Sequence, residues 1–290
     1  MYAITGITGH VGSETARILL ANNQPIRGVF RNLTKAAGWR NNGAEIAIAE
    51  LHDAQALEAA FKHTTGIFVM TPPLFESPDP MADHDQMLMA LSSAIEKTKP
   101  TKVVYLSSIG AHLPTGTGAI KKLYDMEQAF KKLPVATVGI RAGWFMENFV
   151  GGIRQAKQTG QLPSFLNPTN MPVPMVAAKD IGKLVAHLLQ QSWTGHRIIE
   201  LEGPCLYSAN DVASILSGQL NQSISTRLIA VSDYQATYQS YGATPAAAAL
   251  MAEMNNGFNN SHIVFEETGC EHVLGDTLLE DALNSYIHAG

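Results

Sequence analysis

The chain has 290 residues, 46% of them hydrophobic, and a formal net charge of −5 at pH 7. This length and composition predict a soluble globular protein that buries a substantial core, as one large domain or as a domain with a smaller lobe. The small negative charge and the lack of a dense Lys/Arg tract argue against direct binding of nucleic acid, because neutralising phosphates requires a clustered basic face.

Short apolar runs alternate with longer amphipathic segments through the first half of the chain. Apolar side chains spaced at three and four residues predict helices in the longer segments. Strands that alternate with helices in this way are typical of a parallel sheet with right-handed crossovers. We predict an α/β fold with a Rossmann-type, doubly wound parallel sheet in residues 1–150. Its buried strands are expected at residues 2–5, 25–30, 44–49, 66–70, 102–107 and 135–141.

After Arg141 the alternation becomes less regular. We predict that residues 151–290 form a smaller C-terminal α/β lobe, laid over the carboxyl edge of the sheet where ligands of such folds bind. Packing of residues 178–191 back on the main sheet is the alternative, so the boundary near residue 150 is soft. The expected elements are a Pro/Asn-rich connection at 160–174, helices at 178–191, 209–220, 245–256 and 276–287, and a strand at 196–203.

A glycine-rich turn follows the first predicted strand. In "GITGHVG", Gly6, Gly9 and Gly12 are three residues apart, and a helix is expected to start near His10. Glycines at a tight turn let backbone N–H groups and the helix N-terminus approach a pyrophosphate. Because the turn joins the first strand to the first helix, we favour dinucleotide binding. The alternatives are a turn that serves packing alone, a flavin or another nucleotide.

The end of the second strand indicates which dinucleotide is bound. NAD-specific sites carry an acidic side chain about 20 residues past the glycine turn, but Arg31 lies 19 residues beyond Gly12. A guanidinium makes charge-assisted hydrogen bonds with a 2′-phosphate, so the sequence favours NADP(H) over NAD. Lys35 is a second candidate for this phosphate. The alternative is an exposed arginine at a strand end.

Two other strand ends are expected in the same plane. Met70, Thr71 and Pro72 follow the fourth strand, where proline stops the strand and shapes a cleft. Glu50 and Leu51 follow the third strand and are candidates to flank the adenine. For each of these residues the alternative is an ordinary loop position.

Four motifs occur in one order: GxTGxxG, the arginine after the second strand, "YLSSIGAH" and "RAGWFMENF". With them the chain resembles the NmrA-like family of atypical short-chain dehydrogenases/reductases over roughly residues 1–220, and is most similar to its quinone-oxidoreductase-like branch. The resemblance implies an NADP(H)-binding Rossmann domain with a small C-terminal lobe. Some members reduce quinones or similar acceptors, and others are redox-sensing regulators without demonstrated catalysis.

The resemblance also implies roles for individual residues. Ser108 falls where related dehydrogenases hold the serine that bonds a substrate carbonyl, whereas capping of the next element is the alternative for Ser107. His112, in the loop beyond, is a weaker candidate proton donor. The residues that match the phosphate loop are Gly6, Thr8, Gly9, His10, Val11 and Gly12. Arg31 matches the 2′-phosphate site, and Met70, Thr71 and Pro72 match the segment beside the nicotinamide ribose. Phe145 and Asn148 match the aromatic-x-x-Asn turn by the nicotinamide.

The helix in "GAIKKLYDMEQAF" departs from the family pattern. Alignment on Glu127 puts Leu123 where many members have lysine, and Ala119 where a conventional dehydrogenase has tyrosine. None of the eight tyrosines has a lysine four residues later. Lys122 is adjacent to the vacated position, but one residue turns a side chain about 100° around a helix. We therefore expect no Tyr-Lys acid pair.

This loss limits the chemistry. Reduction of a simple ketone makes a basic alkoxide, which needs a positioned proton donor. Reduction of a quinone makes a delocalised hydroquinone anion that can take its proton from water, so positioning and exclusion of solvent suffice. We predict an NADPH-dependent reductase whose substrate is a quinone or a similarly reducible small molecule. The alternative is a non-catalytic NADP(H) redox-sensing regulator that acts through protein partners.

Location, metal content and assembly are less constrained. No apolar run approaches the about 18 residues of a membrane span, and the first strand begins at Tyr2, which leaves no room for a signal peptide. Cys205 and Cys270 predict no disulfide framework, so we expect a cytoplasmic protein. The "DHD" at 83–85 suits a helix N-terminus better than a metal, and no metal is expected. The sequence leaves a homodimer open.

Overall fold

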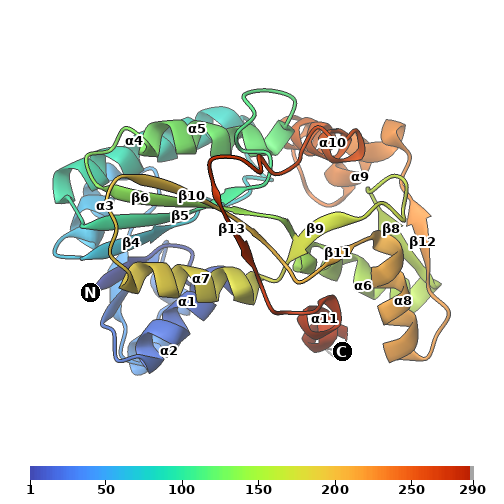
Figure 1. Ribbon diagram of the computed structural model, residues 1–290, viewed down its shortest axis with the longest axis horizontal. Helices are drawn as coiled ribbons and strands as arrows, with labels where there is room; N and C mark the ends of the chain where they lie inside the picture. The colour runs from blue at the N-terminus through green and yellow to red at the C-terminus, as the bar shows by residue number, and fades with distance from the viewer. Residues whose placement is uncertain (288–290) are drawn as a thin grey trace.

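The computed structural model describes residues 1–287 and contains a central sheet of eight parallel strands. The strand order is β13-β10-β6-β5-β4-β1-β2-β3, so the chain reverses its direction of travel across the sheet between β1 and β4 (Figure 1). The predicted Rossmann-type fold is confirmed. The strands are β1 (Tyr2–Ile4), β2 (Ile26–Phe30), β3 (Glu45–Ile48), β4 (Gly66–Val69), β5 (Lys102–Ser108), β6 (Ala136–Ala142), β10 (His196–Glu202) and β13 (Glu271–Leu274).

Helices cover both faces of this sheet. In Figure 1, α4 and α5 lie above it, while α1 and α7 pack together below it. All four residues of β4 are buried, as expected for a parallel strand that is covered on both faces. The helices of this layer are α1 (His10–Ala21), α2 (Ala37–Asn41), α3 (Ala54–Phe61), α4 (Pro80–Thr98), α5 (Lys121–Phe130) and α7 (Ala178–Gln190), with short 3₁₀ turns η1 (Leu33–Lys35) and η2 (Gly118–Ile120).

Local sequence explains where two of these helices begin. The side chain of Asp53 accepts hydrogen bonds from the backbone N–H groups of Gln55 and Ala56, both at 3.0 Å, and so caps α3. Asp79 caps α4 through Ala82 N at 3.1 Å, and Pro80 occupies the first turn, where its missing N–H costs nothing. These caps fix the helices that follow β3 and β4.

The remaining elements form a lobe beyond the carboxyl ends of the strands (Figure 1). It contains a three-stranded sheet, β11-β9-β7, and a two-stranded sheet, β12-β8. Its core also takes in Ile109 and Ile120, which follow β5. The elements are β7 (Trp144–Phe145), η3 (Met146–Phe149), α6 (Val150–Thr159), β8 (Gln161–Ser164), β9 (Val173–Val176), β11 (Leu206–Tyr207), α8 (Ala209–Leu220), β12 (Ser225–Leu228), η4 (Val231–Asp233), α9 (Tyr234–Ser240), α10 (Pro245–Asn259) and α11 (Leu279–Ile287).

The Pro/Asn-rich connection predicted at 160–174 contains strands that the prediction did not include. Strand β8 lies within it and β9 begins in it. Gln161 pairs with Ser225 of β12, more than sixty residues away, and such pairing leaves no trace in local composition. Pro163 is tolerated because β8 belongs to a sheet of only two strands.

The chain returns to the main sheet twice after residue 150. Helix α7 packs on α1, where Thr15 Oγ1 donates to the carbonyl of Gly182 at 3.3 Å. This is the packing considered as the alternative for residues 178–191. Strand β10 then pairs with β6, and β13 with β10. A division into two domains at residue 150 stays a prediction. Among the described residues, no helix is both long and apolar enough to cross a membrane.

Candidate functional site

The glycine-rich turn is tied to the end of β4. The backbone N–H of Thr5 donates to Phe68 O at 3.0 Å, and the hydroxyl of Thr5 accepts from Met70 N at 2.9 Å. These bonds hold the turn after β1 against the neighbouring strand end, at the position where the strand order reverses. In open α/β sheets this is where ligands bind.

Two glycines shape the turn. Gly6 has φ +61°, a left-handed conformation that glycine adopts without strain. A Cβ on Gly12 would lie 2.3 Å from the carbonyl oxygen of Gly6, so helix α1 can pack against the turn only if residue 12 is glycine. Gly9 occupies the N-cap of α1 without a side-chain cap, and the first turn carries no acidic residue. The free N–H groups of α1 are therefore available to a phosphate.

Arg31 and Lys35 lie on the exposed surface beside this turn. Arg31 directly follows β2, which pairs with β1, and Lys35 ends the 3₁₀ turn that Asn32 caps. Within residues 1–287, the Arg31 guanidinium has no hydrogen bond or ion pair. Its donors are free to bind an added phosphate. Glu50 is exposed and lies 3.9 Å from His52, while Leu51 packs partly into the core beneath α3.

The other predicted cofactor residues follow β4 or belong to β7 and η3. Met70 is half-buried, and a Cβ on Gly6 would lie 2.4 Å from its methyl group. Thr71 is half-buried and Pro72 exposed. Phe145, in β7, packs against the core that includes α1, whereas Asn148 is exposed in η3. The structure therefore brings the glycine turn and Met70 into direct proximity, and it connects Phe145 to them through the core.

Sequence reasoning missed the role of Glu147. Its carboxylate accepts from Ala178 N at 3.0 and 3.1 Å and so caps α7 from the aromatic-x-x-Asn turn. Burial raises the pKa of Glu147, although the bond from Ala178 opposes the shift. The contact joins residues 31 positions apart, and no local signal marks it. The cap couples η3 to a helix of the main layer.

The two serines that end β5 have different surroundings. Ser107 is buried and donates to Glu127 Oε1 at 2.5 Å, so its hydroxyl is engaged by this carboxylate rather than by a substrate. Ser108 is half-buried and donates to Ile109 O at 3.1 Å. Its hydroxyl can exchange this local bond for one to a ligand, and its catalytic role stays a prediction.

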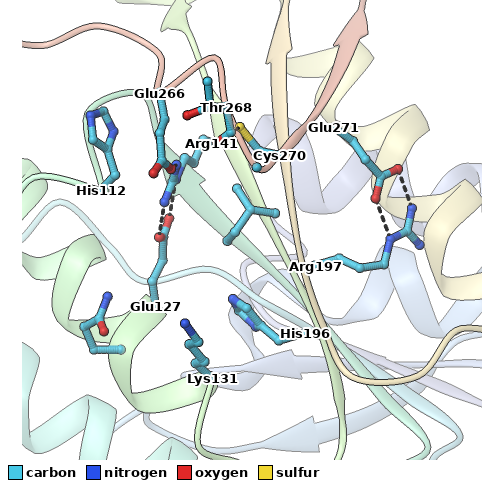
Figure 2. Close-up of a pocket in the computed structure, with 13 residues that line it drawn as sticks. His112, Glu127, Lys131, Arg141, His196, Arg197, Glu266, Thr268, Cys270 and Glu271 are labelled. Carbon is cyan, nitrogen blue, oxygen red and sulfur yellow. Dashed lines mark hydrogen bonds and ion pairs between the residues drawn. The ribbon is translucent and has the colours of Figure 1, made fainter.

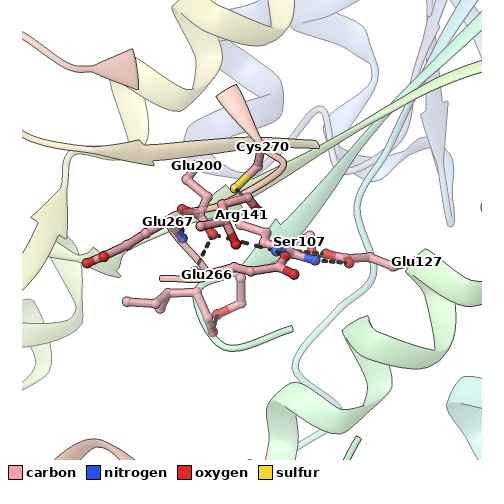
Figure 3. A network of polar contacts seen from close by, with 10 residues as sticks. Ser107, Glu127, Arg141, Glu200, Glu266, Glu267 and Cys270 are labelled. Carbon is pink, nitrogen blue, oxygen red and sulfur yellow. Dashed lines mark hydrogen bonds and ion pairs between the residues drawn. The ribbon is translucent and has the colours of Figure 1, made fainter. Parts of the chain in front are cut away.

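Glu127 belongs to a buried ionic network around Arg141, drawn in Figure 3. Arg141 Nε and Nη2 donate to the two oxygens of Glu127 at 3.0 and 2.8 Å, and Nη1 donates to Glu266 at 2.5 Å. Glu200, fully buried on β10, lies 3.5 Å from Nη1 and accepts from Glu266 N at 2.8 Å. Burial lowers the pKa of Arg141, but the hydrogen bonds to Glu127 and Glu266 and the charges of these carboxylates outweigh it and raise the pKa. The network ties α5, β6 and β10 to the segment before β13.

The structure places His112 beside this network and not in the crevice. It lines a cavity of about 700 Å³ together with Glu127, Arg141, His196 and Glu266 (Figure 2). None of the predicted cofactor residues lines this cavity. Burial, and next the charge of Arg141, lower the pKa of His112. Two of the cations that line the cavity, Arg141 and Arg197, are already paired with carboxylates. The glycine turn, whose N–H groups are free, is therefore the better candidate for a phosphate site.

Helix α5 carries no Tyr-Lys pair toward the crevice. Leu123 is half-buried between the sheet core and the lobe core. Lys122 is buried, and its amine donates to Pro73 O at 3.3 Å, in the loop after β4. Burial lowers the pKa of Lys122 to about 8. Tyr124 lies under Lys121 in a cation–π contact of 5.2 Å and has no part in the site. That the reaction proceeds without a Tyr-Lys acid pair stays a prediction.

His84, on α4, is a buried group that the site does not use. It is fully buried, and neither ring nitrogen has a hydrogen-bond partner among the described residues. Burial, and next the charge of Lys122, lower the pKa of His84 from 6.5 to about 4. An imidazole with a depressed pKa stabilises the fold above pH 6.5, and this contribution is lost as the pH falls toward 4.

We expect the free energy of unfolding to fall by up to roughly 3 kcal/mol between pH 7 and 4 on account of His84 alone. His84→Phe should remove this part of the pH dependence and keep the fold, because it fills the site with a ring that has no polar atoms. Urea unfolding of the wild type and of His84→Phe at several pH values measures how the free energy of unfolding depends on pH. His52→Phe, at an exposed histidine, is the matched control. Equal slopes for the wild type and His84→Phe would contradict the expectation.

The chain is similar to known reductases and dehydrogenases. The model of a family described as "NmrA-like family" matches residues 2–280. NAD(P)H azoreductase of Xenophilus azovorans is 24% identical over 236 residues, which cover 81% of this chain and 79% of that protein. Agroclavine dehydrogenase of Claviceps purpurea (strain 20.1) is 22% identical over 258 residues, with 87% and 84% covered.

Solved structures match over almost the whole chain. An NADPH-dependent quinone oxidoreductase of Escherichia coli, complexed with NADPH, superimposes with a TM-score of 0.80 at 18% identity, covering 98% of this chain and 99% of that one. The triphenylmethane reductase of Citrobacter sp., complexed with NADP(H), gives 0.81 at 16% identity with the same coverage. At these identities the structural likeness shows the fold.

Proposed function

The chain belongs to the NmrA-like family, and from this premise we propose that it is an NADPH-dependent reductase of quinones or similarly reducible small molecules. The observation that carries the proposal is the glycine turn with Arg31 beside it, whose guanidinium has no partner among the described residues. The relatives act as an azoreductase, a dehydrogenase, a quinone oxidoreductase and a triphenylmethane reductase, all of which transfer reducing equivalents.

The residues present suit NADPH. The pyrophosphate would be held by the turn of Gly6, Gly9 and Gly12, which carries no Cβ atoms, and by the free amides of α1. Arg31 and Lys35 would hold the 2′-phosphate. When bound, NADPH supplies a hydride at its nicotinamide ring. We assign Thr8, His10 and Val11 to the phosphates and Glu50 and Leu51 to the adenine end. To the nicotinamide end we assign Met70, Thr71, Pro72, Phe145 and Asn148.

The side chains of α5 favour acceptors that need no positioned acid. Lys122 donates to Pro73 O, and Leu123 presents only apolar atoms between the two cores. A quinone that accepts a hydride becomes a delocalised hydroquinone anion, and one proton from water completes the hydroquinone. Quinones, azo dyes and triphenylmethane dyes are all conjugated acceptors. The substrate we propose therefore belongs to this chemical class, and Ser108 is the candidate donor to its oxygen.

The proposal is tested by adding quinones, azo dyes and simple ketones to the protein with NADPH and following nicotinamide absorbance. We expect turnover of the conjugated acceptors and none of the simple ketones. Brisk reduction of a simple ketone would contradict the argument from α5. Tight NADPH binding without turnover of any acceptor would instead favour a non-catalytic redox-sensing regulator that acts through a protein partner.

Arg31→Ala is expected to weaken NADPH binding by about 10- to 100-fold, because charge-assisted hydrogen bonds contribute about 1.5–3 kcal/mol. NADH lacks the 2′-phosphate, so its dissociation constant should not change. Titration of both cofactors by nicotinamide fluorescence measures the difference. Arg154→Ala, at an exposed arginine on α6, should change neither constant. An equal loss of NADH affinity would show that Arg31 does not read the 2′-phosphate.

A further inference from the structure

The last described helix lies against the cofactor site. Helix α11 follows β13 and packs on η3, α6 and α8 through Leu279, Ala282, Leu283 and Ile287. In Figure 1 it lies between α7 and α8, at the junction of the sheet layer and the lobe. Its position next to η3 brings it to the turn that contains Phe145 and Asn148. Helix α11 therefore packs on the turn that the proposed function assigns to the nicotinamide end of the cofactor.

Tyr286 of this helix reaches the first residue of α1. Its hydroxyl lies 3.1 Å from His10 Nδ1, and the two rings meet edge to face with centroids 5.8 Å apart. His10 begins α1, and its backbone N–H belongs to the free first turn of that helix. The contact spans 276 positions of the chain. It places a phenol hydroxyl one hydrogen bond from a residue of the proposed phosphate loop.

The chemistry of this hydroxyl suits a phosphate. A phenol is both a donor and an acceptor, so it can turn its proton from His10 toward an added anion. Burial, and next the charge of Glu147, raise the pKa of Tyr286, so the hydroxyl stays protonated and can donate. Glu147 itself is engaged by Ala178 N. The ring of Tyr286 is half-buried and packs against the lobe core, which limits the positions its hydroxyl can take.

We propose that Tyr286 is a cofactor-binding residue whose hydroxyl donates a hydrogen bond to the pyrophosphate of the dinucleotide. The inference rests on the proposed function, because it takes the glycine turn as the pyrophosphate site. It adds a consequence: cofactor binding and docking of α11 favour each other by the same factor, as linkage requires. The lobe thereby senses occupancy of the phosphate loop through its last helix.

The test compares Tyr286→Phe with Tyr241→Phe, a matched change at a tyrosine that is 61% exposed. Dissociation constants are measured for NADPH, for ADP-ribose, which keeps the pyrophosphate, and for adenosine 2′-monophosphate, which lacks it. Loss of one hydrogen bond to a charged group should weaken NADPH and ADP-ribose about tenfold or more and leave adenosine 2′-monophosphate unchanged. Tyr241→Phe should match the wild type throughout.

Hydrogen exchange of the α11 amides gives a second readout. NADPH should slow their exchange in the wild type and in Tyr241→Phe, and much less in Tyr286→Phe. Wild-type affinity for NADPH and ADP-ribose in Tyr286→Phe overturns the inference. So does an equal loss for adenosine 2′-monophosphate, which would indicate a general structural role. If the wild type binds NADPH but reduces no acceptor, the proposed reductase activity is wrong, and the comparison of Tyr286→Phe with Tyr241→Phe still tests whether Tyr286 binds the cofactor. A wild type that binds no NADPH overturns both.

Discussion

Gly12→Ala is expected to weaken NADPH binding by about 100-fold or more, because each charge-assisted hydrogen bond lost between the turn and the pyrophosphate costs about 1.5–3 kcal/mol. The new Cβ would lie 2.3 Å from Gly6 O, 2.7 Å from Gly6 C and 2.9 Å from Ile7 N. All three are backbone atoms of the phosphate turn, so no side-chain rotation relieves the overlap. The turn or the start of α1 must move, and with it the N–H groups that would hold the pyrophosphate.

The same change should lower the free energy of unfolding by about 1–3 kcal/mol, the usual cost of overpacking a well-filled region. Gly151→Ala is the matched control, since a Cβ at this position of α6 meets nothing within 4 Å. It should leave NADPH affinity unchanged and stabilise the helix by up to about 1 kcal/mol. Cofactor titration and urea unfolding of both variants measure the two effects. A wild-type dissociation constant for Gly12→Ala would contradict the assignment of the turn.

Arg141→Met is expected to lower the free energy of unfolding by about 3–5 kcal/mol, because it leaves buried carboxylates without their cation. Glu127 and Glu200 are almost completely buried, and Arg141 is the cation that both approach within 4 Å. Ser107 and the backbone of Glu266 still donate to them, which reduces the loss but does not neutralise the charges. The variant should also loosen the segment before β13, which Glu266 anchors.

Arg197→Met provides the comparison for this network. Arg197 makes a two-pronged pair with Glu271 at 2.7 Å, but the two side chains are 25% and 52% exposed. A solvated pair of this kind contributes about 1 kcal/mol or less. Urea unfolding of the two variants, at the same pH and ionic strength, gives the loss of free energy of unfolding for each. The comparison separates the effect of burying the arginine from the effect of the number of hydrogen bonds it makes. Equal losses would show that the burial of Arg141 does not set its importance.

The sheet was predictable where its strands are short, largely apolar runs. The strands β1 to β6 match the predicted apolar runs to within one residue at each end, because strands inside a parallel sheet are mostly apolar. Strand β13, with Glu271 and His272 in it, has no such pattern and exists through its pairing with β10. Strand β8 likewise depends on a partner far along the chain. Pairing between distant segments is what the local sequence does not record.

The same distinction applies to the site. The glycine turn and Arg31 could be placed because a turn between the first strand and first helix is local and its neighbours in the sheet follow from topology. His112 could not be placed in this way, since it lies beside Arg141 and Glu266, which are 29 and 154 residues away in sequence. Glu147 and Tyr286 were missed for the same reason. Their contacts are made by a lobe whose arrangement the pattern did not reveal.

The return of the chain to the main sheet has a consequence for biosynthesis. Strand β6 cannot complete its pairing before β10 is present, and β10 cannot complete its own before β13, whose last residue is Leu274. A nascent chain therefore exposes an unpaired parallel edge until β13 has been synthesised, and such edges are prone to pair with other molecules. Because the lobe is built between these returns, we expect sheet and lobe to be completed in one late cooperative step, with many contacts between distant residues and correspondingly slow folding.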